Sequence, residues 1–176
     1  MGLLVISSNL SPRNKCQLLA REAERVLHQA GHETALLDLA RLPLPLQDVG
    51  TALKDPNVAA ANRLIQPAAG IIIATPIYNY DANAALKNLI ELTGGAWENK
   101  VVAFLCAAGG QAGFMSIMPL ANSLMLDFRC VIVPRFVYAT GSAFSADGIT
   151  DAEIAARIAQ CAHATARLAA ALQTGQ

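Results

Sequence analysis

Five short apolar runs, separated by helix-like segments, constrain the fold of this chain more than any other feature. The runs are rich in β-branched residues and end at glycine, proline or polar turns, which is typical of strands buried on both faces of a sheet. Between them, apolar residues recur at helical spacing. Thr150 and Glu153 have the spacing of a capping box, which predicts the start of the last helix. We expect strands at 3–6, 34–39, 70–74, 101–105 and 130–133, and helices at 14–30, 55–65, 83–92, 114–128 and 150–172.

This alternation predicts an α/β fold: a doubly wound, five-stranded parallel sheet with helices on both faces, because right-handed crossovers must run over the sheet. A chain of 176 residues suits a single domain, 1–176. Five strands at this size favour the order 2-1-3-4-5, whose switch point lies between the first and third strands. The loop after Ile6 should therefore lie beside the loop after Ala74, where open α/β sheets bind ligands.

The first of these loops, 7–15, leads into a helix and is rich in hydroxyls, amides and cations. Unpaired N–H groups and the positive end of the helix dipole converge there, which favours an anion and most plausibly a phosphate. Ordinary capping by Ser11 or Asn14, with Arg13 and Lys15 solvated, is the alternative. Neither the P-loop spacing nor the G-x-G-x-x-G dinucleotide fingerprint is present.

The second loop, 75–81, carries two tyrosines and an asparagine after a buried strand. Aromatic rings stack, and amide and backbone N–H groups meet ring heteroatoms, so the loop suits a flat heterocycle with polar edges. The alternative is that the tyrosines only cover the sheet edge. Asp38 ends the second strand where a ribose-binding acid would sit, but without the glycine fingerprint we interpret it as a loop-capping aspartate.

Composition excludes several classes of protein. The formal net charge is zero and no basic cluster occurs, which argues against nucleic acid and membrane partners. No apolar run reaches eighteen residues and no basic leader precedes the first strand, so we expect a cytoplasmic protein. Four scattered cysteines lack metal-ligand spacing, which predicts buried, reduced thiols and no metal site.

The chain resembles the NAD(P)H-dependent FMN reductase family of flavodoxin-like proteins, and the resemblance extends from about Leu3 to Leu172. The most specific match is Thr75-Pro76-Ile77-Tyr78-Asn79-Tyr80 followed by Leu86-Lys87-Asn88-Leu89-Ile90-Glu91, which is similar to the family pattern T-P-x-Y-N-x…L-K-N-x-[IL]-[DE]. Two further matches support the resemblance. One is the serine-rich first loop, and the other is Trp97-x-x-Lys100-Val101-Val102, which leads into a strand before Gly109-Gly110.

The resemblance implies a flavodoxin-like fold and an FMN cofactor, with NAD(P)H as cosubstrate. It places the FMN phosphate on Ser8, Arg13, Asn14 and Lys15. It places the isoalloxazine ring beside Pro76, Ile77, Tyr78 and Asn79, with Gly109 and Gly110 allowing close approach of the backbone. The first loop departs from the family pattern, because Ser7 replaces a glycine and Arg13 replaces a serine.

The implied activity passes hydride from NAD(P)H through FMN to a flavin, a quinone or another small acceptor. The flavin carries the chemistry, so we expect no catalytic side chain. None of His28, His32 and His163 falls in the expected loops, and Cys16 is interpreted as structural. A flavodoxin-type electron carrier and a non-catalytic FMN-binding protein are the alternatives. The sequence leaves open the physiological acceptor, NADH against NADPH, and FMN as prosthetic group or substrate.

An excess of apolar residues predicts a homodimer or homotetramer. Apolar residues make up 54% of the chain and charged residues only 15%. The helix expected at 114–128 is apolar nearly all round, although Pro119 kinks it or marks its true start. We expect the interface to use this helix and the helix at 83–92, which carries Leu86, Leu89 and Ile90. The alternative is a monomer whose extra apolar residues lie under the loop at 43–45.

Overall fold

The computed structural model of the protein describes residues 2–11 and 14–173. Its central sheet is parallel, in the order β2 (Thr34–Asp38), β1 (Gly2–Ser7), β3 (Ala68–Tyr78), β5 (Val101–Ala107). Two short strands, β6 (Val131–Ile132) and β7 (Val137–Ala139), share the position beyond β5 and both pair parallel with it. The predicted flavodoxin-like order is therefore confirmed, with the fifth position divided between two strands.

The division of the fifth strand corrects the single strand expected at 130–133. Pro134 follows this run and has no N–H to donate to a ladder, so regular pairing with β5 stops after the Val133 N–H bonds the Val102 carbonyl at 2.8 Å. Arg135 then takes a left-handed conformation, with φ of 64°. Pairing resumes only at Val137.

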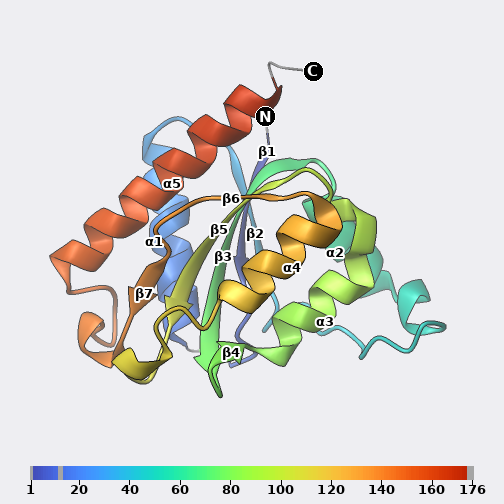
Figure 1. Cartoon of the computed structure of the whole chain (residues 1–176), viewed down its shortest axis with the longest axis horizontal. Helices are drawn as coiled ribbons and strands as arrows, with labels where there is room; N and C mark the ends of the chain where they lie inside the picture. Colours follow the sequence, from blue (N-terminus) through green and yellow to red (C-terminus); the bar gives the residue numbers. More distant parts are fainter. Residues whose placement is uncertain (1, 12–13, 174–176) are drawn as a thin grey trace.

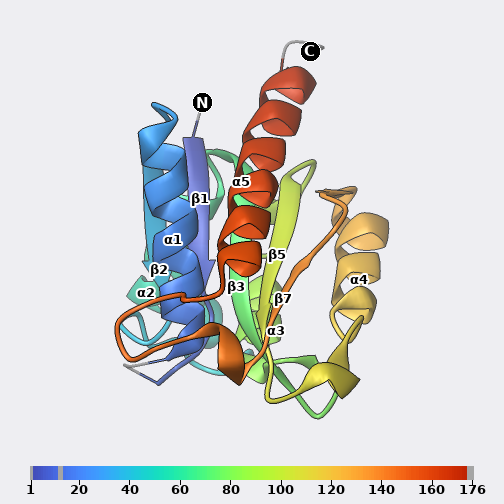
Figure 2. The same ribbon diagram turned by 90° about the vertical axis from the view of Figure 1, so that its left-hand side faces the viewer.

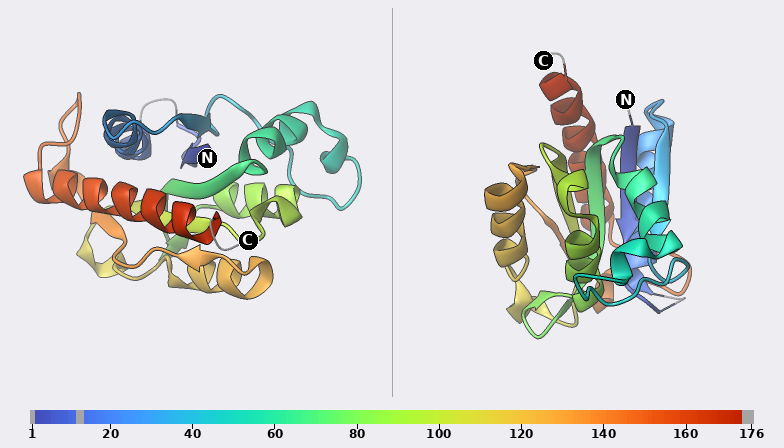
Figure 3. Two further views of the ribbon diagram at one scale, coloured as in Figure 1. Left: turned by 90° about the horizontal axis from the view of Figure 1, so that it is seen from above. Right: turned by 90° about the vertical axis from the view of Figure 1, so that its right-hand side faces the viewer.

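Helices cover both faces of the sheet (Figure 1). Figure 2 shows α1 (Lys15–Gln29) and α5 (Ala152–Gln173) in front of one face. The right-hand view of Figure 3 shows α2 (Pro56–Ile65), α3 (Ala84–Thr93) and α4 (Met118–Phe128) on the other. Strand residues alternate between two cores: Leu3 and Val5 pack under α1 and α5, whereas Leu4 and Ile6 pack on the opposite side. Short 3-10 turns lie at Ala52–Lys54, Gly94–Trp97, Gln111–Gly113 and Gly141–Ala143.

Helix starts follow local capping chemistry. Asn14 caps α1 by accepting a bond from the Gln17 N–H, and Asp55 caps α2, with Pro56 in the first turn as expected. Asp151, rather than the predicted Thr150, caps α5 by accepting bonds from two backbone N–H groups of its first turn. The helix expected at 114–128 begins at Met118, so that Pro119 lies in its first turn and marks the start.

Gly70 allows α5 to lie close to the middle of the sheet. A Cβ at this position would lie 2.9 Å from a Leu3 methyl, 3.1 Å from the Thr165 methyl and 3.2 Å from the Ala169 Cβ. The Leu3 methyl is the end of a flexible side chain and can move, whereas Thr165 and Ala169 belong to α5. The absence of a side chain at position 70 therefore sets the distance between α5 and β3.

The cysteines are structural. All four are buried and free, and burial raises the pKa of the Cys16 thiol, and likewise that of Cys161, to about 12. Burial of this kind disfavours the thiolate, which is the form that acts as a nucleophile or metal ligand. Within the described residues, no helix combines the length and apolarity needed to cross a membrane.

Candidate active site

Three segments meet at the carboxyl edge of the sheet, at the lower end of the molecule in Figure 1. The strand register sets Ser7 of β1 beside Ala74 of β3, and Pro76 of β3 beside Ala107 of β5. The Ser8 N–H continues this pairing by donating to the Ala74 carbonyl at 3.0 Å. The prediction that the first loop lies beside the segment after Ala74 is confirmed.

A buried amide, Asn83, ties these segments together. Its Oδ1 accepts bonds from the hydroxyls of Ser8 at 2.9 Å and Thr75 at 3.2 Å. Its Nδ2 donates to the Ser8 carbonyl at 2.7 Å. The Ser8 hydroxyl, predicted to meet a phosphate, is thus fully buried and bonded within the protein. Sequence reasoning missed Asn83, because an asparagine before a helix is expected to be a cap, and here it makes no capping bond.

The rest of the first loop presents polar groups at the start of α1. The Asn9 amide donates to the Tyr78 hydroxyl at 3.3 Å and accepts from the Ser11 N–H at 2.9 Å, which joins this loop to the end of β3. Asn14 and Lys15 line a polar cavity of about 740 Å³, together with Gln17, Leu18, Arg21, Arg41 and residues 145–147. The predicted phosphate ligand Arg13 lies outside the described residues.

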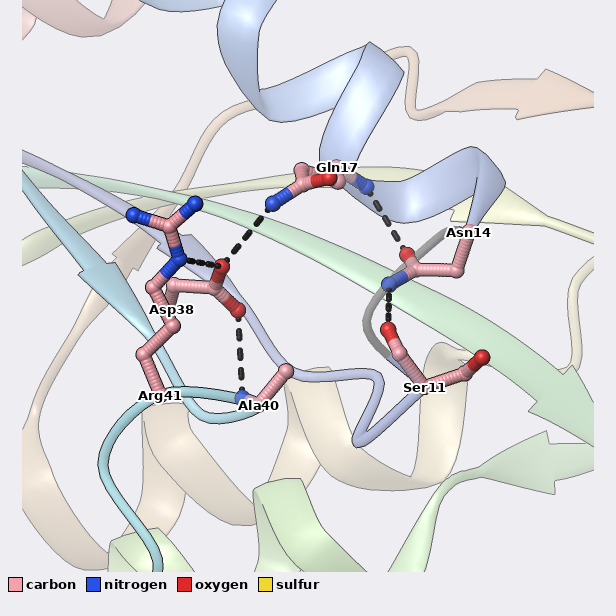
Figure 4. A network of polar contacts seen from close by, with 6 residues as sticks. All are labelled: Ser11, Asn14, Gln17, Asp38, Ala40 and Arg41. Carbon is pink, nitrogen blue, oxygen red and sulfur yellow. Dashed lines mark hydrogen bonds and ion pairs between the residues drawn. The ribbon is translucent and has the colours of Figure 1, made fainter. Parts of the chain in front are cut away.

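Asp38 belongs to the same region, and Figure 4 shows its contacts. It accepts bonds from the Gln17 side chain at 3.0 Å and from the Ala40 N–H at 3.1 Å, and Arg41 lies 3.6 Å away. These bonds occupy both carboxylate oxygens and confirm its interpretation as a loop-capping residue. The neighbouring cavity is lined by three cations, Lys15, Arg21 and Arg41, and by one carboxylate, Asp147.

The segment at 75–81, expected to be a loop, is a hairpin. Strand β3 continues to Tyr78, turns at Asn79 and Tyr80, and pairs with β4 (Asp81–Ala82) in antiparallel register. Both turn residues have positive φ values, 51° and 62°, which suits the twist of a two-residue hairpin but is unfavourable for tyrosine. The hairpin leaves Tyr78, Asn79 and Tyr80 exposed, while Pro76 and Ile77 are buried.

The loop after β5 completes the site. Gly109 and Gly110, with the hairpin residues Ile77, Asn79 and Tyr80, line an open cavity of about 280 Å³; its remaining lining residues are Ala108, Ala112, Gly113 and Tyr138. A Cβ on Gly109 or Gly110 would meet nothing within 4 Å, so packing inside the chain does not require glycine there. The missing side chains instead leave the backbone open toward the cavity, as a flat ring needs.

Tyr138 on β7 contacts this loop. Sequence reasoning missed it because the strand that carries it was not predicted. Its hydroxyl donates to the Gly110 carbonyl at 3.4 Å, and its ring meets Phe114 edge to face at 5.8 Å. A Cβ on Gly113 would lie 2.4 Å from the same hydroxyl. Burial raises the pKa of Tyr138, so the phenol stays protonated and donates at neutral pH.

The motif 86–91 serves the scaffold. Asn88 binds the proline-rich loop with both ends of its amide, accepting from the Gln47 N–H and donating to the Pro45 carbonyl, each at 2.9 Å. Lys87 and Glu91 form an exposed ion pair at 2.8 Å. In the part of the chain that the structure describes, no group of three acidic, histidine or cysteine side chains could hold a metal ion.

The composition of this edge fits FMN: a cationic, polar cavity at a helix start and a glycine-lined cavity beside exposed aromatic residues. Comparison with known families decides the matter, because residues 1–145 match the family described as NADPH-dependent FMN reductase. The chain belongs to this family. It is an NAD(P)H-dependent oxidoreductase with FMN as its cofactor.

Individual relatives agree. An NAD(P)H-dependent FAD/FMN reductase of Geobacillus thermodenitrificans is 28% identical over 99% of this chain and 97% of its own length. An NAD(P)H:quinone oxidoreductase of Solanum tuberosum is 29% identical over 73% of this chain and 71% of its own. The crystal structure of an oxidoreductase from Corynebacterium diphtheriae shares the fold, with a TM-score of 0.77 at 22% identity and 96% coverage of both chains.

Proposed function

We propose that the first loop, the hairpin at 75–82 and the loop at 108–113 together hold FMN while hydride passes from NAD(P)H to a small acceptor. The observation that carries this proposal is the open cavity between the hairpin and the bare backbone of Gly109 and Gly110. The flat ring would lie there against Ile77 and Asn79, which line the cavity, with Pro76 and Tyr78 beside them on the same hairpin. The Asn79 amide has no hydrogen-bond partner among the described residues and is available to the ring edge.

The phosphate end of FMN would lie at the start of α1. Asn14 and Lys15 supply an amide and a cation there, and the first N–H groups of the helix favour an anion. We include Arg13 in this set from its place in the sequence. Ser8 would act indirectly, because its hydroxyl and carbonyl fix the loop to Asn83.

When bound, FMN supplies the reversible acceptance of a hydride. The protein residues orient the reactants: Tyr138 holds the glycine loop, and the hairpin presents its exposed side chains next to the ring position. No histidine takes part in this arrangement. His28 bonds the Thr34 hydroxyl at 2.6 Å, next to the start of β2 and far along the sheet from the site edge.

The cavity is open on its outer side, so the nicotinamide donor and the acceptor would occupy the same ring face in turn. Among acceptors we favour a quinone or a free flavin, the classes named by the relatives in potato and Geobacillus. The four buried, free cysteines suit a reducing compartment, and we place the protein in the cytoplasm.

Anaerobic mixing of the FMN-loaded protein with NADPH, and separately with NADH, tests the activity. We expect rapid loss of oxidised-flavin absorbance, which a quinone then restores. Tightly bound flavin that neither nicotinamide reduces would instead favour the electron carrier or the non-catalytic binding protein. Comparing both nicotinamides across quinone, azo dye and free FMN also gives the specificity.

We further propose that α4 and the turn before it form a subunit interface. Large apolar side chains are exposed on this segment and next to it: Phe114, Met115, Met118, Met125, Leu126 and Val131. These side chains are exposed, so the loop at 43–45 does not cover them. A self-complementary patch of this kind is most simply covered by a second copy about a twofold axis.

The prediction that the apolar residues of α3 take part in this interface was wrong. Leu86, Leu89 and Ile90 are buried in the core of their own chain, and the outer face of α3 carries Lys87 and Glu91 instead. Sedimentation equilibrium tests the interface: we expect a dimer or tetramer that Leu126→Lys dissociates. A single 18.5 kDa species would contradict it.

A further inference from the structure

A basic groove lies outside the candidate flavin site. It runs between α5 and the segment 133–136 that links β6 to β7, and has a volume of about 240 Å³. It shares no residue with the two cavities of the candidate active site. Its lining consists of Val133, Pro134, Arg135, Phe136, Arg157, Gln160, Cys161, Ala164 and Arg167.

The contribution of α5 comes from one helix face. Arg157, Gln160 and Arg167 follow helical spacing, and the two arginines lie ten residues apart, or about 15 Å along the axis. Between them, Cys161 and Ala164 form an apolar floor, which Phe136 continues on the facing segment. The groove therefore has a cation toward each end, an amide between them and a mainly apolar base.

The positive charge in the groove is only partly neutralised within the chain. Arg157 pairs with Glu153 at 2.9 Å on the same helix. The side chains of Arg135 and Arg167 have no ion pair or hydrogen bond within residues 2–11 and 14–173. The protein as a whole is neutral, so this excess is a local feature. Guanidinium groups bind oxyanions through two parallel hydrogen bonds, which makes such a groove suited to carboxylate or phosphate.

The backbone holds Arg135 in place. The residue lies between two strands that pair with the same neighbour, β5, and its φ of 64° is unfavourable for a side chain of this size. Unfavourable conformations persist only where the surrounding structure imposes them, and they concentrate at functional sites. The break in the fifth strand is therefore also what places a third arginine opposite α5.

We infer that this groove binds a small dianionic oxyanion, a phosphate compound or a short dicarboxylate, at a site separate from the flavin. Its volume of about 240 Å³ lies below the range of about 300–1,000 Å³ that is usual for pockets of drug-sized ligands, so the groove suits a small ligand better than a dinucleotide. The ligand would contact Arg135 and Arg167 directly, while Gln160 donates from its amide between them. Arg157, already paired, contributes mainly its charge.

Thermal unfolding of the FMN-loaded protein tests the inference, because bound FMN occupies the other phosphate-binding position. Inorganic phosphate, pyrophosphate and succinate are each compared with potassium chloride at matched ionic strength and pH. At ten times its Kd, a true ligand should raise Tm by about 3–6 °C. The ranking of the three anions separates phosphate compounds from dicarboxylates.

Variants locate the effect. Arg135→Ala combined with Arg167→Ala should remove the rise, whereas Arg63→Ala, an exposed arginine on the other face of the sheet, should leave it unchanged. Isothermal titration with the most stabilising anion repeats the comparison at constant temperature. If the double variant unfolds, Arg167→Glu on the exposed face of α5 replaces it and should also abolish binding.

Three results would overturn the inference. The first is that no anion raises Tm beyond the chloride control. The second is that the groove variants show the same rise in Tm as the unaltered protein. The third is loss of the rise in a Lys15→Ala variant that still carries FMN, which would locate the anion at the start of α1.

Discussion

The two sides of the candidate flavin site are built in different ways. The first loop is fixed to the sheet by the buried amide of Asn83, whose bonds to Ser8 and Thr75 all lie out of solvent. The turn of the hairpin and the glycine loop are exposed, with unfavourable conformations at Asn79 and Tyr80 and a phenol contact from Tyr138. A buried polar network gives a fixed position, whereas exposed turns give access. The phosphate end of a cofactor needs the first, and the reacting ring needs the second.

The largest effect should come from breaking the buried side with Asn83→Ala. The change leaves two hydroxyls and a carbonyl without their partner, so we expect a loss of about 3 kcal/mol in the free energy of unfolding. Urea unfolding of the apoprotein measures it. Asn9→Ala removes a half-buried amide of the same loop, whose hydrogen bonds are exposed, and should cost less than about 1 kcal/mol. Equal losses in the two variants would contradict the difference between buried and exposed hydrogen bonds.

Removing the cations of the first loop should act on the phosphate alone. Arg13→Ala combined with Lys15→Ala is expected to weaken FMN binding about 150-fold, because two charged hydrogen bonds are lost and each contributes at least about 1.5 kcal/mol. Riboflavin, which lacks the phosphate, should lose less than threefold as an order-of-magnitude expectation. Fluorescence titration of both flavins measures the ratio. Equal affinity of the unaltered protein for FMN and riboflavin would rule out a phosphate site here.

On the exposed side, Gly113→Ala should disturb the glycine loop. The new methyl would lie 2.4 Å from the Tyr138 hydroxyl, so the loop or the phenol must move. We expect about tenfold weaker FMN binding, or about 1.4 kcal/mol. Adding Tyr138→Phe removes the oxygen and should restore affinity to nearly that of Tyr138→Phe alone. Independent, additive losses would show that the contact does not position the loop.

The smallest effect should come from relaxing the hairpin. Tyr80→Gly places glycine where φ is 62°, the arrangement that two-residue hairpins favour after asparagine. We expect a gain of about 0.5–1 kcal/mol in the free energy of unfolding. Chemical unfolding of the apoprotein decides it, with Tyr78→Phe as a control that keeps the backbone unchanged. A loss of stability would mean that the Tyr80 ring makes contacts that outweigh its conformation.

The features that could be predicted from the sequence are those that local residue patterns determine. Apolar runs and helical spacing gave the strand order and the meeting of the two loops, and Pro119 was recognised as a possible helix start. The sequence did not predict the break in the fifth strand, because a run ending at Pro134 gives no sign that pairing resumes three residues later. Asn83 and Tyr138 were missed for a related reason: their roles depend on partners far along the chain, which local pattern does not identify.

The close approach of α5 over Gly70 has a consequence at the level of the genetic code. Every single-base change that replaces a glycine codon by that of another amino acid introduces at least a Cβ, and here that atom meets Thr165 and Ala169 on the helix. Crowding of this kind costs about 1–3 kcal/mol in a packed core. Position 70 thus has no harmless one-step neighbour, and error-prone copying followed by selection for folded protein should return it as glycine.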